Sequence, residues 1–442
     1  MNMPDRRLPT LTQAFRVWLK IGLLSFGGPA GQIALMHRVV VDELKWVGER
    51  RFLHALNFCT LLPGPEAQQL ATYLGWLMHG VKGGLIAGLL FILPGAFVML
   101  VLSLAFVLLG HIPLMAGLFF GLKCAVLVLV VEALLRIARR ALKGKAAYLM
   151  AAVAFIGLFL LKIPFPLIVI GAGIVGLLLP RAFTHRWHDA ADVDAPALID
   201  ALLAREPQRA QDLAKGARWA GLGAVILWLV PAAIFVFLVG GTYGDIAAFF
   251  SKMAVVTVGG AYAVLAYVAQ DAVQSYHWLT GPEMLTGLGL AETTPGPLIL
   301  VLQFVGFLAG FRADGVPGAL LGAVITLWVT FAPCFAFVFL GAPWIEKMQC
   351  SRLLAGSLAA ITAAVVGVIA NLALWFGLHV LFREQAAMTL GSLQIDLPIP
   401  SSIDPVAAAL ALLAALALFR FRFGVFGTLA LTSVCGLATV LL

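Results

Sequence analysis

A motif that occurs twice constrains this chain more than any other feature of its sequence. Residues 20–65 contain K-I-G-L-L-S-F-G-G-P, then a tryptophan, then P-G-P, and the same frame returns 232 positions later. Trp46 aligns with Trp278, Lys20 with Lys252, and the P-G-P string at 63–65 with the one at 295–297. Duplicated apolar segments that glycine and proline interrupt are typical of transporters whose site lies between broken helices.

Composition places the chain in a membrane. It has 442 residues, of which 62% are hydrophobic and 11% are charged, and this is too apolar for a soluble core. The basic residues that produce the net charge of +8 lie in the loops between spans, where they determine the orientation of the protein in the membrane. We therefore expect membrane lipids as partners, and no nucleic acid. The N-terminus has no apolar core of a cleaved signal peptide. The sequence predicts spans at 85–109, 114–135, 217–239, 317–341 and 353–378, and shorter ones at 146–162, 164–180, 403–419 and 423–442.

Loop charges predict that the two halves face opposite sides of the membrane. Loop 37–51 carries four Lys/Arg and its counterpart 269–283 none, while 136–145 carries five and 379–402 one. The prediction is an all-α polytopic membrane protein, built as an inverted repeat with Gly/Pro-broken or re-entrant helices. Its parts are an N-terminal repeat (1–180), a cytoplasmic linker (181–216), an inverting transmembrane helix (217–240) and a C-terminal repeat (241–442). The N-terminus is expected to be cytoplasmic.

The breaks predict an anion site. A proline cannot donate its N–H and opposes the helical turn before it, so a new helix can begin directly after each break. The free N–H groups and the positive dipole end of such a helix attract anions. Breaks that only allow close helix packing are the alternative. The predicted substrate-binding set joins the breaks, their polar neighbours and intramembrane cations: Lys20, Gly27, Gly28, Pro29, Gln32, Arg38, Pro63, Gly64, Pro65, Glu66, Gln68, Lys123, Lys252, Gly259, Gly260, Glu292, Thr294, Pro295, Gly296 and Pro297.

Charged residues inside the predicted spans or the broken apolar segments are candidates for function, because burying a charge in a bilayer is costly. Lys20 and Lys252 either attract anions or extend to the headgroups. Glu132 is expected to pair with Arg136 one turn later, which leaves Lys123 in need of another partner, such as the substrate. Glu66, at the start of the helix after P-G-P, either couples or gates transport or caps its own helix.

The strings S-F-G-G-P-A-G-Q-I-A (25–34), L-L-P-G-P-E-A-Q-Q-L-A-T-Y-L-G-W (61–76) and T-P-G-P (294–297) resemble those of the chromate ion transporter family, in its long two-domain bacterial form. The resemblance implies a protein of the bacterial inner membrane that exports chromate and confers resistance to it. It covers nearly the whole chain outside the linker. It places Gly27, Gly28, Pro29, Gln32, Arg38, Trp46, Pro63, Gly64, Pro65, Glu66 and Gln68 on the family's first-half motifs. The second half departs from the pattern at V-G-G-A (258–261) and at Glu292.

The predicted function is export of the oxyanion chromate by alternating access, without a cofactor or a metal site. Chromate and sulfate are both tetrahedral dianions, so the sequence leaves a carrier of sulfate or another anion open, as well as a passive anion channel. A membrane enzyme is disfavoured because the chain has no H-E-x-x-H motif, no clustered acids and no Ser/His pairing. A homodimer is left open.

Overall fold

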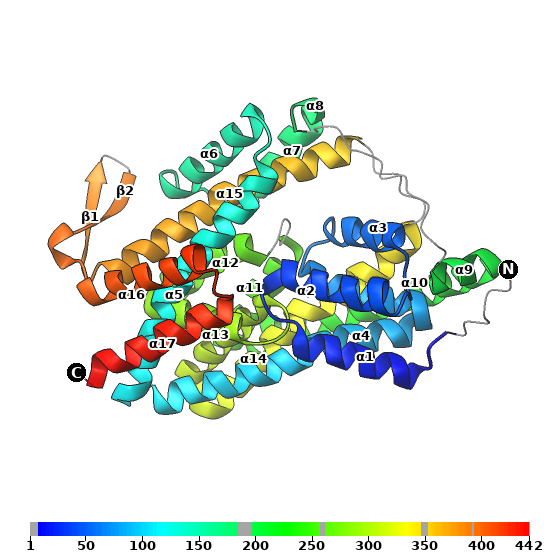
Figure 1. The fold of residues 1–442 in the computed structure, drawn as a ribbon, viewed down its shortest axis with the longest axis horizontal. Helices are drawn as coiled ribbons and strands as arrows, with labels where there is room; N and C mark the ends of the chain where they lie inside the picture. The colour runs from blue at the N-terminus through cyan, green and yellow to red at the C-terminus, as the bar shows by residue number, and fades with distance from the viewer. Residues whose placement is uncertain are drawn as a thin grey trace. The chain divides into compact units, whose positions relative to one another are not determined.

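The computed structural model describes residues 8–110, 112–183, 197–256, 261–345, 352–390 and 393–441. Nearly all of the regular structure in these ranges is helical (Figure 1). The five helices that are long and apolar enough to cross a membrane are Glu66–Leu109, Pro113–Ala141, Gln211–Val239, Leu298–Pro343 and Ala355–Leu381. Four of them contain a clear span that the sequence predicts, and Ala355–Leu381 covers all but the first two residues of the fifth, 353–378. The expected all-α polytopic class is confirmed.

The helices form two compact units, each of which draws on both halves of the sequence. The first unit comprises 1–99, 187–261 and 294–349, and the second comprises 100–186, 262–293 and 350–442. The predicted repeats therefore describe how the sequence is duplicated, and they do not coincide with the two compact units. Their boundaries remain a prediction. The elements of the first unit are α1 (Leu11–Leu24), α2 (Gly28–His37), η1 (Arg38–Glu43), α3 (Glu49–Cys59), most of α4 (Glu66–Leu109), α9 (Leu198–Arg205), α10 (Pro207–Ile234), η2 (Phe235–Val239), α11 (Gly241–Val256), η4 (Leu298–Leu300) and α14 (Val301–Ile345).

The second unit packs around two long apolar helices, α5 and α15. Small residues let the backbones approach closely: a Cβ on Gly121 would collide with the Thr432 carbonyl oxygen, and one on Gly367 with that of Ala151. The elements are α5 (Pro113–Ala141), α6 (Lys145–Phe159), α7 (Phe165–Leu178), α8 (Pro180–Phe183), α12 (Ala261–Gln270), η3 (Asp271–Ser275), α13 (Gly281–Thr293), α15 (Arg352–Leu381), β1 (Gln385–Leu390), β2 (Leu393–Pro398), η5 (Pro400–Ser402), α16 (Pro405–Ala415), η6 (Leu416–Arg420) and α17 (Val425–Leu441).

Strands β1 and β2 form an antiparallel hairpin, the one pair of strands among the described residues. The sequence predicts a loop across 379–402 and misses this hairpin. The antiparallel ladder follows the apolar and polar alternation L-Q-I-D-L at 393–397, a period of two residues that belongs to strands.

Local backbone geometry repeats along the chain and supports the duplication. Lys45 and His277, 232 positions apart, both have positive φ angles, of 51° and 54°. Lys162, later in the first half, has a φ angle of 48°, and Arg422, later in the second half, has a φ angle of 55°. Side chains other than glycine rarely adopt such angles, so matched outliers indicate the same local fold in both halves. The orientation of the halves in the membrane stays a prediction.

The long helices α4 and α14 each contain one sharp kink at corresponding places. At His79 and Gly80 the φ/ψ angles are −131°/25° and 61°/−152°, and at Asp314 and Gly315 they are −138°/28° and 63°/−148°. Glycine permits the positive φ that such a kink requires. Each of these helices is therefore a short first part followed by a long membrane-crossing part, which matches the predicted span at 85–109.

Part of the linker is docked onto the first repeat. Of the predicted connector 181–216, residues 184–196, with His185 and His188, lie outside the described residues. From 197 onward the chain forms α9 and the start of α10. Leu198 N–H donates to the Lys45 carbonyl at 3.2 Å, and Ile199 N–H to that of Trp46 at 3.0 Å. This portion is thus part of the folded first unit.

Replacing Asp200 with alanine is expected to loosen this docking. Its Oδ2 accepts from Gly48 N–H at 3.1 Å and its Oδ1 from Arg51 Nε at 2.5 Å. Hydrogen bonds to a charged group contribute about 1.5–3 kcal/mol, so hydrogen–deuterium exchange in peptides over 45–51 should accelerate about tenfold or more. Asp212→Ala, at an exposed position in α10, is the matched control. Equal exchange in both variants would contradict the prediction.

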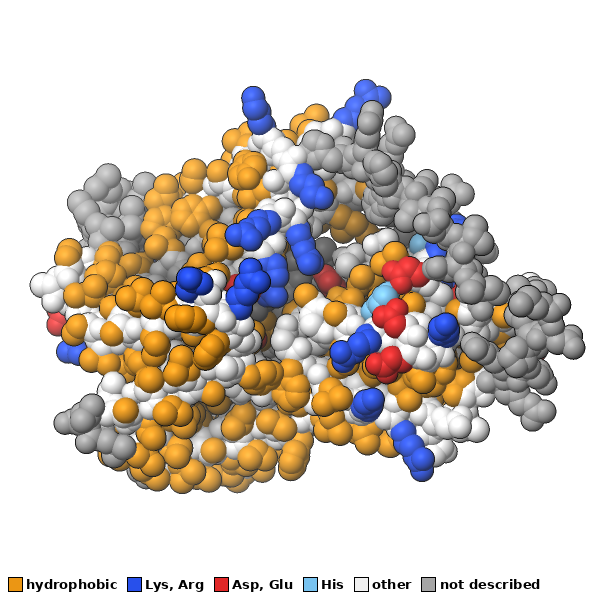
Figure 2. All heavy atoms as spheres, viewed as in Figure 1, with side chains coloured by type: hydrophobic (Ala, Val, Ile, Leu, Met, Phe, Trp, Pro, Cys, Tyr) orange, Lys and Arg blue, Asp and Glu red, His pale blue; other side chains and the backbone are white. Residues whose placement is uncertain are grey.

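The surface of the transmembrane helices is apolar, as contact with lipid requires. Hydrophobic side chains cover much of the face of the described helices seen in Figure 2. On the segment from α10 to η2, Trp219, Phe237 and Leu238 are 78%, 82% and 80% exposed. Monomeric soluble proteins rarely expose so large an apolar surface, and such surfaces mark contact with a membrane or another protein.

Candidate functional site

The first break separates α1 from α2 and depends on two glycines. Gly27 and Gly28 have φ angles of 83° and 69°, and Pro29 follows in the first turn of α2. Ser25, which is fully buried, turns its hydroxyl back to donate to the Ile21 carbonyl at 2.6 Å. The backbone carbonyl of Ser25 is left outside the helical hydrogen-bonding pattern and accepts from elsewhere in the chain.

The second break, Pro63-Gly64-Pro65, separates α3 from α4. A glutamine amide and a cysteine sulfur pack against it. Gly64 has a φ of 116°, and a Cβ there would lie 2.8 Å from Cys334 Sγ. Gln69, one turn into α4, donates from Nε2 to the Pro63 carbonyl at 2.6 Å. The side chain of Gln69 thus satisfies a carbonyl that the break removes from helical pairing.

The third break, at 294–297, meets the first one. Gly296, with a φ of 90°, donates its N–H to the Ser25 carbonyl at 2.7 Å. Gln32 Nε2 donates to the Gly296 carbonyl at 2.5 Å. Residues from opposite halves of the sequence therefore pair through their break backbones. The fourth predicted break, with Gly259 and Gly260, lies outside the described residues.

The two halves also interlock through their proline-containing helices. In α4, Gly95 packs so closely on the break that a Cβ there would collide with the Pro295 carbonyl oxygen. In α14, Cys334 packs on Gly64. The pairs Pro94-Gly95 and Pro333-Cys334 are 239 positions apart, as are Lys123 and Thr362. Each half therefore places the same part of its long helix against the P-G-P break of the other half.

The start of α4 offers unpaired donors in a buried setting. Within the described residues, the N–H groups of Glu66, Ala67 and Gln68 have no hydrogen-bond partner, whereas Gln69 N–H donates to the Pro65 carbonyl at 3.1 Å. These are the groups that the first turn of any helix leaves free. Glu66 itself is half-buried. The helix dipole and the free donors make this end of α4 favourable for an anion.

Among the described residues, the buried polar side-chain atoms that have no hydrogen-bond partner all belong to the first unit. Four are glutamine Oε1 atoms, of Gln32, Gln68, Gln69 and Gln303, and one is the indole donor Nε1 of Trp76. An unpaired buried polar atom costs about 1–3 kcal/mol, so such atoms indicate a functional demand. Gln303 Nε2 meanwhile donates to the Ala96 carbonyl at 3.0 Å, which adds a further link between the halves.

The predicted cations do not share this buried setting. The side chains of Lys20, Arg38 and Lys252 are exposed, and Arg38 lies 3.8 Å from Glu43. Lys123 belongs to the second unit, on α5, where it is half-buried.

The acidic residues divide between an ion pair and a buried helix end. Glu132 lies 3.3 Å from Arg136, and the predicted ion pair is confirmed. Glu292 is 7% exposed in the last turn of α13, and Thr294 is 2% exposed at the break.

Sequence reasoning missed two of the contacts that build the site. Gly95 and Cys334 were not expected to touch the breaks, although their shared repeat position was a usable signal. Gln69 and Gln303 were not among the predicted binding residues. Their roles depend on which carbonyl each amide reaches, and this follows from the packing of segments more than two hundred residues apart.

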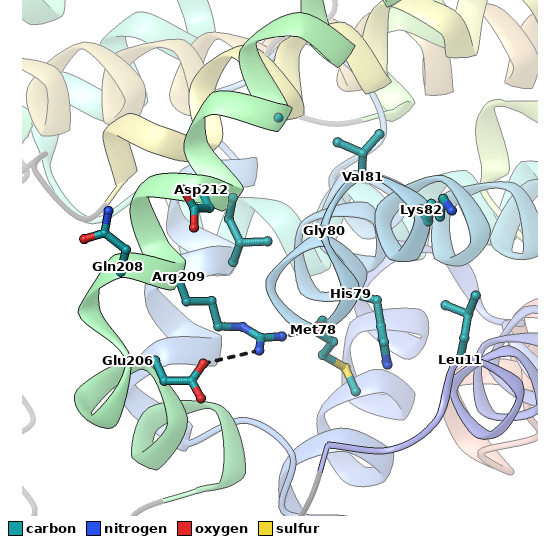
Figure 3. A pocket seen from close by; sticks show the side chains of 12 residues that line it. Leu11, Met78, His79, Gly80, Val81, Lys82, Glu206, Gln208, Arg209 and Asp212 are labelled. Atoms are coloured by element: carbon teal, nitrogen blue, oxygen red, sulfur yellow. Dashed lines mark hydrogen bonds and ion pairs between the residues drawn. The ribbon is translucent and has the colours of Figure 1, made fainter.

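A separate cavity lies at the kink of α4, nearly four turns beyond Glu66 (Figure 3). Its volume is about 960 Å³. Arg209 of α10 donates to the Met78 carbonyl at 3.1 Å and lies 3.6 Å from Glu206, so its charge is partly neutralised. The lining carries charges of both signs and does not favour an anion. Its residues are Leu11, Met78, His79, Gly80, Val81, Lys82, Glu206, Gln208, Arg209, Asp212, Leu213 and Gly216.

Comparison with known proteins agrees with the duplicated architecture. The sequence model of one family, described as Chromate transporter, matches residues 12–177 and 244–440, which fall in the two repeats. The chromate transport protein of Pseudomonas aeruginosa is 33% identical over 81% of this chain and 79% of its own length. The probable chromate transport protein of Synechococcus elongatus is 27% identical over 83% and 84%. The uncharacterized transporter YwrB of Bacillus subtilis is 32% identical over 34% of this chain and 79% of its own length. No solved structure matches.

Proposed function

The chain belongs to the chromate transporter family, and from this premise we propose that it exports chromate from the bacterial cytoplasm by alternating access and thereby confers resistance to chromate. The observation that carries the proposal is the start of α4. There a P-G-P break frees the N–H groups of residues 66–68, and the break packs against the other half of the duplicated chain. Free amides at a helix N-terminus bind oxyanions without needing a cofactor.

Export is also the direction that the membrane potential favours. Moving one charge across 100 mV contributes about 2.3 kcal/mol, so a dianion that leaves a negative interior gains about 4.6 kcal/mol. That free energy sustains a concentration ratio of roughly a thousandfold, because each 1.4 kcal/mol is a factor of ten. The exposed Lys20 and Lys252 are proposed to attract the anion towards the breaks of the first unit.

The direct test measures uptake of labelled chromate into everted membrane vesicles that contain the protein. Saturable uptake, driven by an interior-positive potential, is the expected result. Flux that does not saturate and proceeds at channel rates would replace the carrier with a passive channel. Uptake of sulfate with equal preference would make the protein a general carrier of tetrahedral anions. Absence of anion uptake would overturn the proposal.

The proposed setting is the inner membrane, with the N-terminus and the linker in the cytoplasm. The inverted arrangement predicts that the loops at Lys45 and Ser275, both exposed, face opposite sides. In intact cells a membrane-impermeant maleimide should modify Ser275→Cys but not Lys45→Cys. Lys45→Cys should react only after the cells are opened, which is the internal control. Labelling of both positions from outside would show that the halves are parallel.

A further inference from the structure

The buried glutamines add unpaired hydrogen-bond acceptors to a site whose free backbone amides are donors. Gln32, Gln68, Gln69 and Gln303 are 1%, 0%, 0% and 2% exposed, and the Oε1 atom of each has no hydrogen-bond partner in the part of the chain that the structure describes. All four belong to the first unit and stand at the breaks or on the helix turns that follow them. The site thus presents unpaired acceptors as well as unpaired donors.

The hydrogen bonds of the four amides establish which atom of each is the acceptor. Gln32, Gln69 and Gln303 donate from Nε2 to the carbonyls of Gly296, Pro63 and Ala96, at 2.5, 2.6 and 3.0 Å. A rotated amide would place oxygen against oxygen at each of these contacts, so the assignment is set by the backbone.

Gln68 is oriented in the same way by a hydroxyl. Thr72 Oγ1 donates to the Gln68 carbonyl at 3.0 Å, so it is left to accept from Gln68 Nε2, also at 3.0 Å. Gln68 and Gln69 both belong to the first turn of α4, the turn that carries the free N–H groups of residues 66–68.

The charge of the break segments favours a ligand of low charge. Residues 25–32, 60–69 and 294–303 contain no lysine or arginine, and the one charged residue among them is Glu66. A dianion at this place would meet a carboxyl group and acceptor oxygens, all of which repel it. A ligand that carries both an O–H group and one negative charge would satisfy the acceptors and the amides together.

We propose that the site takes its substrate as the protonated monoanion, hydrogen chromate, whose O–H donates to a glutamine Oε1 at the start of α4 while its other oxygens accept from the free N–H groups. The inference rests on the proposed function and names the ionic form that is carried. With one charge per ion instead of two, the concentration ratio that 100 mV sustains falls from roughly a thousandfold to roughly fiftyfold. Chromate is partly protonated near neutral pH, whereas sulfate is not. The acceptors therefore distinguish two ions of the same shape, because a ligand without a proton leaves them unpaired. Since the four oxygens are closed off from solvent here, the ligand reaches them when the contacts between the breaks open.

The charge that crosses with each chromium atom tests the proposal. Purified protein in liposomes, with equal pH on both sides, is brought to equilibrium with labelled chromate at potentials set by a potassium gradient and valinomycin. A monoanion should change the accumulation ratio about tenfold for each ~60 mV, and a dianion about a hundredfold. A hundredfold response overturns the inference and leaves the proposed function intact. A wild-type protein that moves no chromate overturns both. A requirement for sodium, a cation that the oxygens would also suit, overturns the inference.

A matched pair of variants assigns the effect to the acceptor. Gln68→Met removes Oε1 at nearly constant volume, whereas Thr326→Val removes a buried hydroxyl that donates to the Gly322 carbonyl within α14 and leaves the glutamines unchanged. Gln68→Met should lower the preference for chromate over sulfate, measured by competition, about tenfold, which corresponds to one hydrogen bond. Thr326→Val should stay within about twofold of the wild type. An unchanged preference in Gln68→Met and Gln69→Met, with both proteins folded and transporting, would overturn the role of these acceptors.

Discussion

Replacing Pro63 and Pro65 together with alanine abolishes anion transport, on this account, without lowering the amount of protein in the membrane. The two prolines separate α3 from α4 and free the N–H groups of residues 66–68. With alanine at both positions, one helix can continue from α3 into α4. The N–H groups then pair with the carbonyls four residues earlier and are lost to a ligand.

The stability of this double variant separates the two roles of the break. Proline in a helix interior costs about 3 kcal/mol relative to alanine, so the variant can be as stable as the wild type or more so while inactive. Chromate resistance and vesicle uptake report activity, and thermal unfolding in detergent reports stability. Pro113→Ala, at an exposed proline in the first turn of α5, is the control and should keep wild-type transport. A double variant that transports normally would mean that the breaks serve packing, and the site would lie elsewhere.

Adding a single methyl group at Gly95 should disrupt the contact between the halves. The Cβ of Gly95→Ala would collide with the Pro295 carbonyl oxygen and lie 2.6 Å from Leu300 Cδ1. Because the first obstacle is backbone, it cannot be relieved by a rotamer change. Overpacking of this kind costs about 1–3 kcal/mol, and here it also pushes the break at 294–297 away from α4.

A second glycine provides the matched comparison. A Cβ on Gly223 of α10 meets nothing within 4 Å, so Gly223→Ala adds the same methyl group to a helix without a collision. Alanine is favoured over glycine in a helix by about 1 kcal/mol, so this variant should be slightly more stable than the wild type. We expect Gly95→Ala to unfold at a lower temperature and to lose most of its transport, while Gly223→Ala keeps it. Similar behaviour of the two variants would show that the close approach at Gly95 is not required.

The break of each half is in contact with the long helix of the other half, so the two breaks are coupled through these helices. The Pro94-Gly95 step of α4 packs on the second-half break, and Cys334 of α14 packs on the first-half break. A movement that opens one break therefore displaces a helix that runs from the other. Such paired contacts suit alternation between two arrangements, because packed interfaces tend to hold discrete states rather than deform continuously.

The sequence by itself determined the features that depend on local chemistry. Spans follow from the length of apolar runs, and helix ends follow from glycine and proline, whose φ preferences act on the residue itself and its immediate neighbours. The expected breaks at 27–29, 63–65 and 295–297 therefore appear where the sequence places them. The same holds for the pair of Glu132 and Arg136, since residues four apart on a helix are always neighbours.

Only the tertiary structure decided which distant segments meet. Gln32 pairs with Gly296 across 264 residues, and Asp200 of the linker pairs with Arg51 across 149. Neither pairing can be read from composition or periodicity, because many polar residues and many free carbonyls are equally suitable partners until packing selects among them. For the same reason Lys20 is a plausible buried cation by its sequence position but lies exposed in the fold. The sequence limits the interactions that a residue can make, and the packing of the folded chain selects which of them it makes.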